Sequence, residues 1–393
     1  MSIKMKKTYS REMQNLDAAG LLRTETAVVQ SENMEARISE NKNTLNFIGN
    51  DFLGWSSNDD IRKTAKEALS NYGTGNTSSR ISIGTLDIFK TLEDTLANFL
   101  DLDDCIVFPS NYLANIGVFE PLTSQKDTIF IDEMCNPGLF DGVRLSNANV
   151  VSYKTKDYED LEYHLKCSPN SRFRIIVTDA VFNADGDYAD FSRIQELKKT
   201  YDAITIVDDS LGVGILGENG KGTFSHLQLE KKAELITGSF AYALGNVSGG
   251  FVCGDKDLVN WIRHTSRSYI LSEPISPVNA AIVLNVIEIL EKDQSAIDKL
   301  YSNSNYIKME MLHKKWKLIN NDYPFVSINV GSTLNAQKIV DYLFEMNILV
   351  SGLCYPNTPE GASLLRINLS ANHTKRQIDK LIYAIEQAFN HLE

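Results

Sequence analysis

Two adjacent aspartates, Asp208 and Asp209, follow the apolar run ITIV and precede a glycine-rich stretch that ends near residue 222. A carboxylate at the end of a buried strand lies where an α/β sheet binds its ligand, and it accepts hydrogen bonds from cationic groups there. Aspartates also cap the turns that follow strands, and the pattern alone leaves both interpretations open. Residues 234–254 repeat the order of strand, turn of small residues and glycine-flanked strand. These two segments are the first candidates for a functional site.

The elements that position these residues are predicted by alternating apolar and amphipathic segments. From about residue 105, short runs such as RIIVTDA and ITIVDDS alternate with helix-length stretches such as FSRIQELKKTY. This alternation is typical of βα units and of a mostly parallel sheet buried on both faces. Ligands of such a sheet lie at the carboxyl ends of its strands. The predicted fold class is therefore α/β.

The pattern changes after Pro277, where two long helices are followed by alternating strands and helices. This change predicts a smaller α+β domain at the C-terminus. Before residue 45 we expect an arm that contains one amphipathic helix, REMQNLDAAGLL, and then a polar stretch. The predicted division is an N-terminal arm at 1–50, a large domain at 51–285 and a small domain at 286–393.

The composition excludes several classes of function. The chain has 393 residues, and 39 Lys and Arg against 51 Asp and Glu give a net charge of −12. An acidic chain without a basic cluster is not expected to bind nucleic acid or an anionic membrane. We expect no signal peptide, and no apolar run reaches the roughly 20 residues of a membrane helix. The five scattered cysteines predict reduced thiols in the cytoplasm and no metal site.

Several long motifs, in order along residues 12–390, resemble the α-oxoamine synthases, a family of pyridoxal-phosphate (PLP) enzymes of fold type I. FPSNYLANIGV is similar to the family's "SGY-x-AN" turn, and VFNADGDYADFSRIQEL is similar to "SMDGD-x-APL". LLRINLSANHTKRQIDKL is similar to "LR-x-x-LSA-x-HT … ID-x-L". The resemblance implies an aspartate-aminotransferase-like fold with a seven-stranded, mostly parallel sheet. It also implies an acyltransferase chemistry that condenses an amino acid with an acyl thioester.

The resemblance assigns roles to particular residues. Asp208 is implied to keep the PLP ring nitrogen protonated, as an electron sink requires, and Asn111 and Tyr112 lie in the turn on the phosphate side. Arg366 is implied to hold the amino acid's carboxylate, for which a guanidinium fork is suited. An arginine in this position is otherwise often part of a surface ion pair.

Two serines match phosphate-binding positions of the family. Ser239 stands where the family has a threonine, and Ser272, in SYILSEPISP, matches a serine that reaches the phosphate of the neighbouring subunit. Either hydroxyl is equally typical of an ordinary turn, so both interpretations stay open.

Three positions depart from the family. Tyr242 stands where "GT-x-SKALG" has the Schiff-base lysine, and a phenol with a pKa of about 10 cannot form an imine. Asn136 stands at the position of the ring-stacking histidine, and Leu211 at the second histidine, in "D-E-A-H". The nearest lysines, Lys231, Lys232 and Lys256, are interpreted as surface charges.

With these three departures, the chain resembles the lysine-lacking, non-catalytic long-chain-base subunit of serine palmitoyltransferase. DDSLGVGILGENGKG is similar to that subunit's "EESLSFGVLGEHGRG", Phe89 replaces a histidine of active relatives, and Cys135 aligns with an interfacial cysteine. A heterodimer is implied, with PLP bound by a lysine-bearing partner, or non-covalently by this chain, and no internal aldimine here. The implied pathway is sphingolipid or secondary-metabolite biosynthesis.

Three hypotheses remain open from the sequence. The first is the non-catalytic subunit of a heterodimeric acyltransferase. The second is an active homodimer that binds PLP without a covalent link, or that transfers acyl groups without PLP. The third is a scaffold or regulatory protein that has lost its ligand.

Overall fold

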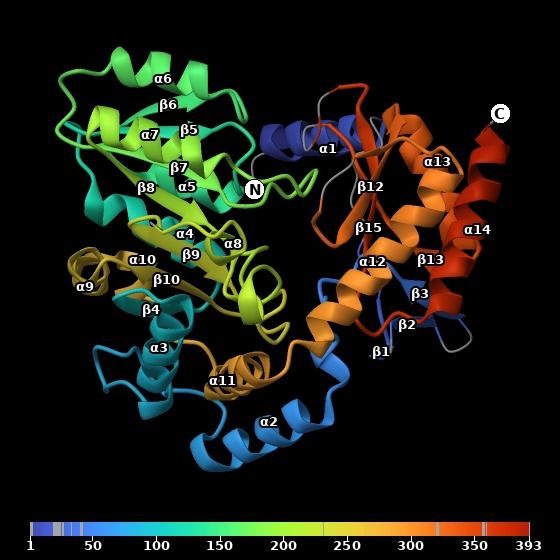
Figure 1. Cartoon of the computed structure of the whole chain (residues 1–393), viewed down its shortest axis with the longest axis horizontal. Helices are drawn as coiled ribbons and strands as arrows, with labels where there is room; N and C mark the ends of the chain where they lie inside the picture. Colours follow the sequence, from blue (N-terminus) through green and yellow to red (C-terminus); the bar gives the residue numbers. More distant parts are fainter. Residues whose placement is uncertain are drawn as a thin grey trace.

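The structure is a computed structural model that describes residues 3–18, 25, 27–32, 34–39, 42–230, 232–319, 322–355, 358 and 360–392. The chain forms a larger lobe around a central sheet and a smaller lobe that contains the C-terminus (Figure 1). Helix α11 (Pro277–Lys292) leads from the first lobe to the second and packs against α2 and α3.

The larger lobe is built on a seven-stranded sheet in the order β4-β10-β9-β8-β7-β5-β6. Only β10 runs opposite to the others, because it pairs antiparallel with both β4 and β9 while the remaining pairs are parallel. The predicted mostly parallel sheet is confirmed, and each predicted apolar run forms one of its strands. The strands are β4 (Asp104–Phe108), β5 (Thr128–Asp132), β6 (Asn149–Tyr153), β7 (Arg174–Asp179), β8 (Ala203–Asp208), β9 (Leu235–Ser239) and β10 (Gly250–Gly254).

Helices cover both faces of this sheet, so its strands are buried on both sides, except for edge strand β6, of which only Tyr153 is buried. Successive residues of a strand point to opposite faces: Ile129 and Ile131 pack in one cluster with α4, α5 and α9, whereas Phe130 packs in another with α6, α7 and α8. The helices of this lobe are α2 (Asp59–Tyr72), α3 (Asp87–Leu100), α4 (Asn111–Leu122), α5 (Pro137–Leu145), α6 (Tyr158–Lys166), α7 (Phe191–Tyr201), α8 (Thr223–His226), α9 (Lys256–Thr265) and α10 (Arg267–Ile270), with 3-10 turns at Trp55–Ser57 and Glu218–Gly220.

The smaller lobe contains a four-stranded antiparallel sheet in the order β11-β12-β15-β14, with long helices beside it (Figure 1). The predicted helices and strands after Pro277 are all present. They are α12 (Ser295–His313), β11 (Leu318–Ile319), β12 (Phe325–Gly331), α13 (Thr333–Glu345), β13 (Ile348–Leu349), β14 (Ser351–Leu353), β15 (Ser363–Asn368) and α14 (Lys375–Leu392).

The N-terminal segment contains a helix, as expected, and also strands that the sequence did not predict. Helix α1 covers Ile3–Ala18, while residues 19–22 of the predicted helix lie outside the described residues. Strands β1 (Gln30–Glu32), β2 (Glu35–Ser39) and β3 (Lys42–Asn46) form a sheet with β13, which is about 300 residues away along the chain. This polar segment gains its partner only in the folded chain, so its own pattern gives little signal. The division at residues 50 and 285 stays a prediction.

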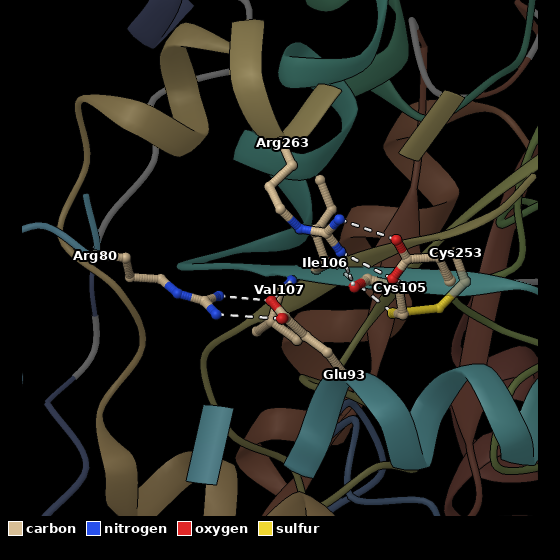
Figure 2. The surroundings of a disulfide bond; sticks show 8 residues. Arg80, Glu93, Cys105, Ile106, Val107, Cys253 and Arg263 are labelled. Carbon is tan, nitrogen blue, oxygen red and sulfur yellow. Dashed lines mark hydrogen bonds and ion pairs between the residues drawn. A yellow bond between two sulfur atoms is a disulfide. The ribbon is translucent and has the colours of Figure 1, made fainter. Parts of the chain in front are cut away.

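The prediction of five reduced thiols is wrong for two cysteines. Cys105 and Cys253 form a disulfide, with 4.1 Å between their Cα atoms. They are direct partners in the β4–β10 ladder (Figure 2), but 148 residues separate them in the sequence, so spacing could not reveal the pair. The free thiols are those of Cys135, Cys167 and Cys354.

One buried and one half-buried ion pair hold edge strand β4 beside this disulfide (Figure 2). Arg80 donates to both carboxylate oxygens of Glu93, at 2.6 and 3.2 Å, and Glu93 also accepts the backbone N–H of Val107 at 3.2 Å. Arg263 donates to both oxygens of Asp104, at 2.9 and 2.8 Å. These contacts fix the strand that leads into α4.

No helix in the described part of the chain is long and apolar enough to cross a membrane. Among the same residues, no group of three or more His, Cys, Asp or Glu side chains has the geometry of a metal site.

Candidate active site

The carboxyl ends of the strands of the larger sheet meet at a cavity of about 490 Å³. Asp208 ends β8 and is the direct ladder partner of Asp179, which ends β7. Asn136 follows β5, and Tyr242 lies in the loop after β9. All four residues line the cavity. The sheet edge that the sequence predicted as the ligand site therefore has a cavity.

Asp208 accepts several hydrogen bonds although it is only 3% exposed. The side-chain amides of Asn111 and Asn115 donate to Oδ2 at 3.1 and 2.8 Å, and the backbone N–H of Ser210 donates to Oδ1 at 2.9 Å. Around this carboxylate, three buried atoms have no hydrogen-bond partner within the described residues: Asn111 Oδ1, Asn115 Oδ1 and Ser210 Oγ. Buried polar atoms without partners are uncommon, and a bound polar ligand is one explanation for them.

Two further buried aspartates lie beside Asp208. Burial, together with the nearby charge of Asp208, raises the pKa of Asp179 well above its usual value. Burial also raises the pKa of Asp209 to about 7, against the opposing effect of hydrogen bonds from Thr223. Clusters of carboxyl groups with raised pKa values are typical of functional sites, because such sites place like charges close together.

Asn136 lines the cavity and also has a structural role. Its side-chain oxygen accepts the N–H of Gly138 at 2.8 Å and so caps the N-terminus of α5. Its backbone N–H donates to Asp179 Oδ1 at 3.0 Å. The amide is therefore held at the strand ends by the fold of the α5 cap.

Tyr242 packs at 6.3 Å from the ring of Phe52, measured between ring centroids. Burial raises the pKa of its phenol, and the nearby carboxylate of Asp208 raises this pKa further. The phenol is thus neutral near pH 7 and can donate a hydrogen bond. Among the described residues that line the cavity, none is a lysine.

The lysines named from the sequence lie elsewhere where the structure describes them. Lys232 donates to the backbone oxygens of Leu100 and Asp101, and Lys256 is exposed at the start of α9. Lys231 lies outside the described residues.

Arg366, on β15 of the smaller lobe, is only 6% exposed. Its Nη1 donates to the backbone oxygen of Asn183 and, at 2.6 Å, to Asn183 Oδ1, while its Nε donates to Asn368 Oδ1 at 3.0 Å. Its guanidinium carbon lies 3.9 Å from the ring centre of Phe325. Burial lowers the pKa of Arg366 to about 10. Because Asn183 lines the cavity, the guanidinium is linked to the site through this one side chain.

Of the other predicted site residues, some line the cavity and others do not. Leu211 lines the cavity, and its carbonyl accepts the Tyr323 hydroxyl at 2.8 Å. Ser239, at the end of β9, accepts the N–H of Ala241 at 3.1 Å, which is a turn contact. Ser272 and Tyr112 are not part of the cavity lining: the Ser272 hydroxyl donates to the Ser268 carbonyl, and the Tyr112 hydroxyl donates to Asp141 at 2.6 Å. The roles of all these residues stay predictions.

Sequence reasoning did not identify Asp179, Asn115 or Asn183. Asp179 carried a usable signal, because it ends a predicted strand as Asp208 does. Asn115 is the last residue of the "SGY-x-AN" match but was given no role, and Asn183 gave no signal. Their contacts are with Asp208, 93 positions away from Asn115, and with Arg366, 183 positions away from Asn183.

A larger cleft of about 1100 Å³ lies between the N-terminal segment, α2, α12 and the start of α14. Its lining includes Trp55, Lys299 and Gln377, but none of the residues at the strand ends of the larger sheet. The smaller cavity is the better candidate, because the strand ends and the carboxyl group of Asp179, whose pKa is raised, lie there.

Comparisons with known proteins agree with this fold. The family model described as aminotransferase class I and II matches residues 42–385. The 2-amino-3-ketobutyrate coenzyme A ligase of Escherichia coli strain K12 is 32% identical to this chain, over 95% of each protein. The 8-amino-7-oxononanoate synthase of Thermosipho melanesiensis is 31% identical over 96% of each. A solved serine palmitoyltransferase from S. paucimobilis, with bound PLP–myriocin aldimine, superposes with a TM-score of 0.91 at 25% identity, over 100% of this chain and 99% of that one.

The fold is therefore that of a fold-type-I transferase of the class I and II aminotransferase group. Within that group, the chain belongs to the α-oxoamine synthase family of PLP enzymes.

Proposed function

We propose that this chain is the lysine-lacking, non-catalytic subunit of a heterodimeric, serine-palmitoyltransferase-like acyltransferase. In the complex, an amino acid and an acyl thioester condense: a carbon–carbon bond forms, and CO2 and the thiol carrier leave. The observation that carries the proposal is Tyr242, which lines the cavity beside Asp208 at the position where the family motif has its lysine.

The chemistry of Tyr242 supports this assignment. A primary amine is required to form an imine with the aldehyde of PLP and then to move the α-proton of the substrate. A phenol cannot form an imine, and the raised pKa of Tyr242 keeps its proton in place near neutral pH. Tyr242 can therefore donate a hydrogen bond to a ligand but cannot replace the amine. The covalent step is assigned to a related, lysine-bearing partner chain.

The residues around Asp208 fit the cofactor of this family without a covalent link. Asp208 supplies a carboxylate acceptor for a ring N–H, and the orphaned oxygens of Asn115 and Ser210 supply further polar contacts. The first turn of α4, which begins at Asn111, has backbone N–H groups suited to a phosphate. When bound, PLP acts as an electron sink for the substrate's α-carbon. In this chain, Asp208 would hold the ring, Arg366 would hold a carboxylate, and Tyr242 would keep a proton at its phenolic oxygen.

The test is co-expression with lysine-bearing members of the family from the same genome, followed by affinity purification through a tag on this chain. The proposal predicts a stable complex that turns over acyl thioester and amino acid, while this chain alone does not. An Asn390→Ala variant, at an exposed position on α14 away from the cavity, is the control, and it should leave the activity of the complex unchanged. Failure of every candidate to co-purify, or equal activity without the partner, would count against the proposal.

A second candidate function is an active homodimer with non-covalently bound PLP, and retention of Asp208, Ser239 and Arg366 favours it. Turnover by the isolated chain identifies this case. A scaffold without a ligand is the third outcome: an Asp208→Ala change would then leave a partner's activity unaltered.

A cytoplasmic location is part of the same proposal. The free thiols of Cys135, Cys167 and Cys354 support it, whereas the Cys105–Cys253 disulfide does not. Fractionation of the source cells tests it, and recovery of the chain outside the cytoplasm would contradict it.

A further inference from the structure

Asp208 and Arg366, the two charged groups at the candidate site, each form a hydrogen bond with the side chain of an asparagine. Asn111 donates to the carboxylate of Asp208, and Asn183 accepts from the guanidinium of Arg366. Both amides come from residues at the start of an element or in a turn, where a side chain can rotate without disturbing a helix or a strand.

Arg366 lacks a counter-charge. Its hydrogen-bond acceptors are the carbonyl and amide oxygens of Asn183 and Asn368, and no carboxylate forms an ion pair with it among the described residues. A buried cation without an anionic partner is costly, because neutral amides replace only part of its lost hydration. A carboxylate from a ligand would neutralise this charge.

Asn183 is the contact of Arg366 that a ligand can displace. Asn368 is anchored, since its own amide donates to the carbonyls of Ile48 and Gly49 at 3.2 Å each. Asn183, in contrast, is exposed and lines the cavity. Rotation of the Asn183 side chain would remove one of the two contacts of Nη1, leaving the bond to the Asn183 backbone oxygen, and would open room for a carboxylate beside the guanidinium.

Asn111 is the corresponding contact of Asp208, although Asn111 does not itself line the cavity. Asn115 is fully buried, and Ser210 uses its backbone N–H, so neither donor can easily leave. Asn111 is only half-buried and stands at the first position of α4. It is also the position at which the family motif "SGY-x-AN" has a glycine, which has no side chain to place there.

We infer that Asn111 and Asn183 are internal substitutes for a ligand: the Asn111 amide occupies the place of a ligand's cationic N–H at Asp208, and the Asn183 amide occupies the place of a ligand's carboxylate at Arg366. Each asparagine thus lowers the affinity of the isolated chain for one part of the ligand. The inference rests on the proposed function only in taking this cavity as the ligand site.

The test measures binding to the isolated chain by calorimetry with two probes. Pyridoxine 5′-phosphate has an alcohol in place of the aldehyde, so it cannot react with surface lysines and reports on Asp208. Glycine has an ammonium group and a carboxylate, and it reports on Arg366. The variants are Asn111→Ala and Asn183→Ala, with Asn390→Ala, an exposed position on α14, as the matched control. Thermal melts establish that each variant is folded.

Removal of one competing hydrogen bond is expected to tighten binding about tenfold, which corresponds to about 1.4 kcal/mol. Asn111→Ala should tighten pyridoxine 5′-phosphate binding, Asn183→Ala should tighten glycine binding, and Asn390→Ala should change neither. Unchanged affinity, weaker binding in either variant, or no binding of either probe to any of the proteins would overturn the inference.

These outcomes are separate from those of the proposed function. Affinity shifts in a chain that finds no lysine-bearing partner would leave the inference standing and remove the proposed function. Unchanged affinities in a chain that does form an active heterodimer would remove the inference alone.

Discussion

The buried pair of Arg80 and Glu93 provides a quantitative test of how the fold supports the site. Their side chains are 5% and 2% exposed, and two hydrogen bonds join them. The Arg80 guanidinium also lies 5.5 and 5.4 Å from the ring centres of Phe89 and Tyr269. Replacing Arg80 with methionine keeps much of this packing but leaves the carboxylate of Glu93 buried without its main partner.

Loss of one member of a buried pair typically costs about 3–5 kcal/mol. Here we expect the lower end, about 3 kcal/mol, because Lys90 remains at 3.0 Å from Glu93 and the N–H of Val107 still donates to it. Adding Glu93→Gln removes the charge and keeps an acceptor for Val107, so the double variant should recover about 2 kcal/mol of that loss.

Urea unfolding of the wild type, both single variants and the double variant measures the free energies of unfolding that make up this double-mutant cycle. A loss below about 1 kcal/mol for Arg80→Met, or a double variant no more stable than that single variant, would refute the reasoning. The first result would mean that solvent reaches the pair, and the second that packing of the arginine stem, rather than charge, determines the loss.

Three further perturbations have expected outcomes. Thiol titration in denaturant should find three thiols before reduction and five after it, and five thiols without reductant would contradict the disulfide. Changing both Cys105 and Cys253 to alanine should lower the free energy of unfolding by about 2–4 kcal/mol. The pKa of Asp209 rises from 3.8 to about 7 on folding, so between about pH 4 and 7 this carboxyl group is protonated in the folded chain and ionised in the unfolded chain. Its contribution to the free energy of unfolding should therefore fall as pH rises through this range, by at most about 4 kcal/mol. Asp209→Asn should flatten that part of the pH profile measured by urea unfolding, and an unchanged slope would contradict the assignment. Gly142→Ala should destabilise the fold by about 2 kcal/mol, because its Cβ would lie 2.5 Å from the backbone oxygen of Asn115, and unaltered thermal stability would show that α4 and α5 can separate at little cost.

The sequence predicted those parts of the fold that depend on local pattern. Most strands of the large sheet are short apolar runs rich in β-branched residues, and their ends follow the run closely, as for ITIVDD and Asp208. Burial on both faces makes such runs continuously apolar, which is why they are easy to recognise. The carboxylate edge of the sheet followed from the same pattern.

Contacts between remote segments were not predictable in this way. The disulfide joins Cys105 and Cys253 across 148 residues, and Asn183 contacts Arg366 across 183. These pairs form because neighbouring strands and the two lobes meet, and neither residue of a pair carries a mark of its partner. The strands before residue 46 are similar, since β3 is completed by β13 near the other end of the chain.

The central claim is that no lysine of this chain holds the cofactor at the site, and one measurement tests it most directly. The chain is purified from its source cells without added PLP, reduced with borohydride, and digested for peptide mass spectrometry, with a lysine-bearing relative treated in parallel. The account predicts a pyridoxyl group on one lysine of the relative and on no lysine of this chain. A pyridoxyl-lysine peptide recovered in stoichiometric amount from this chain would contradict it.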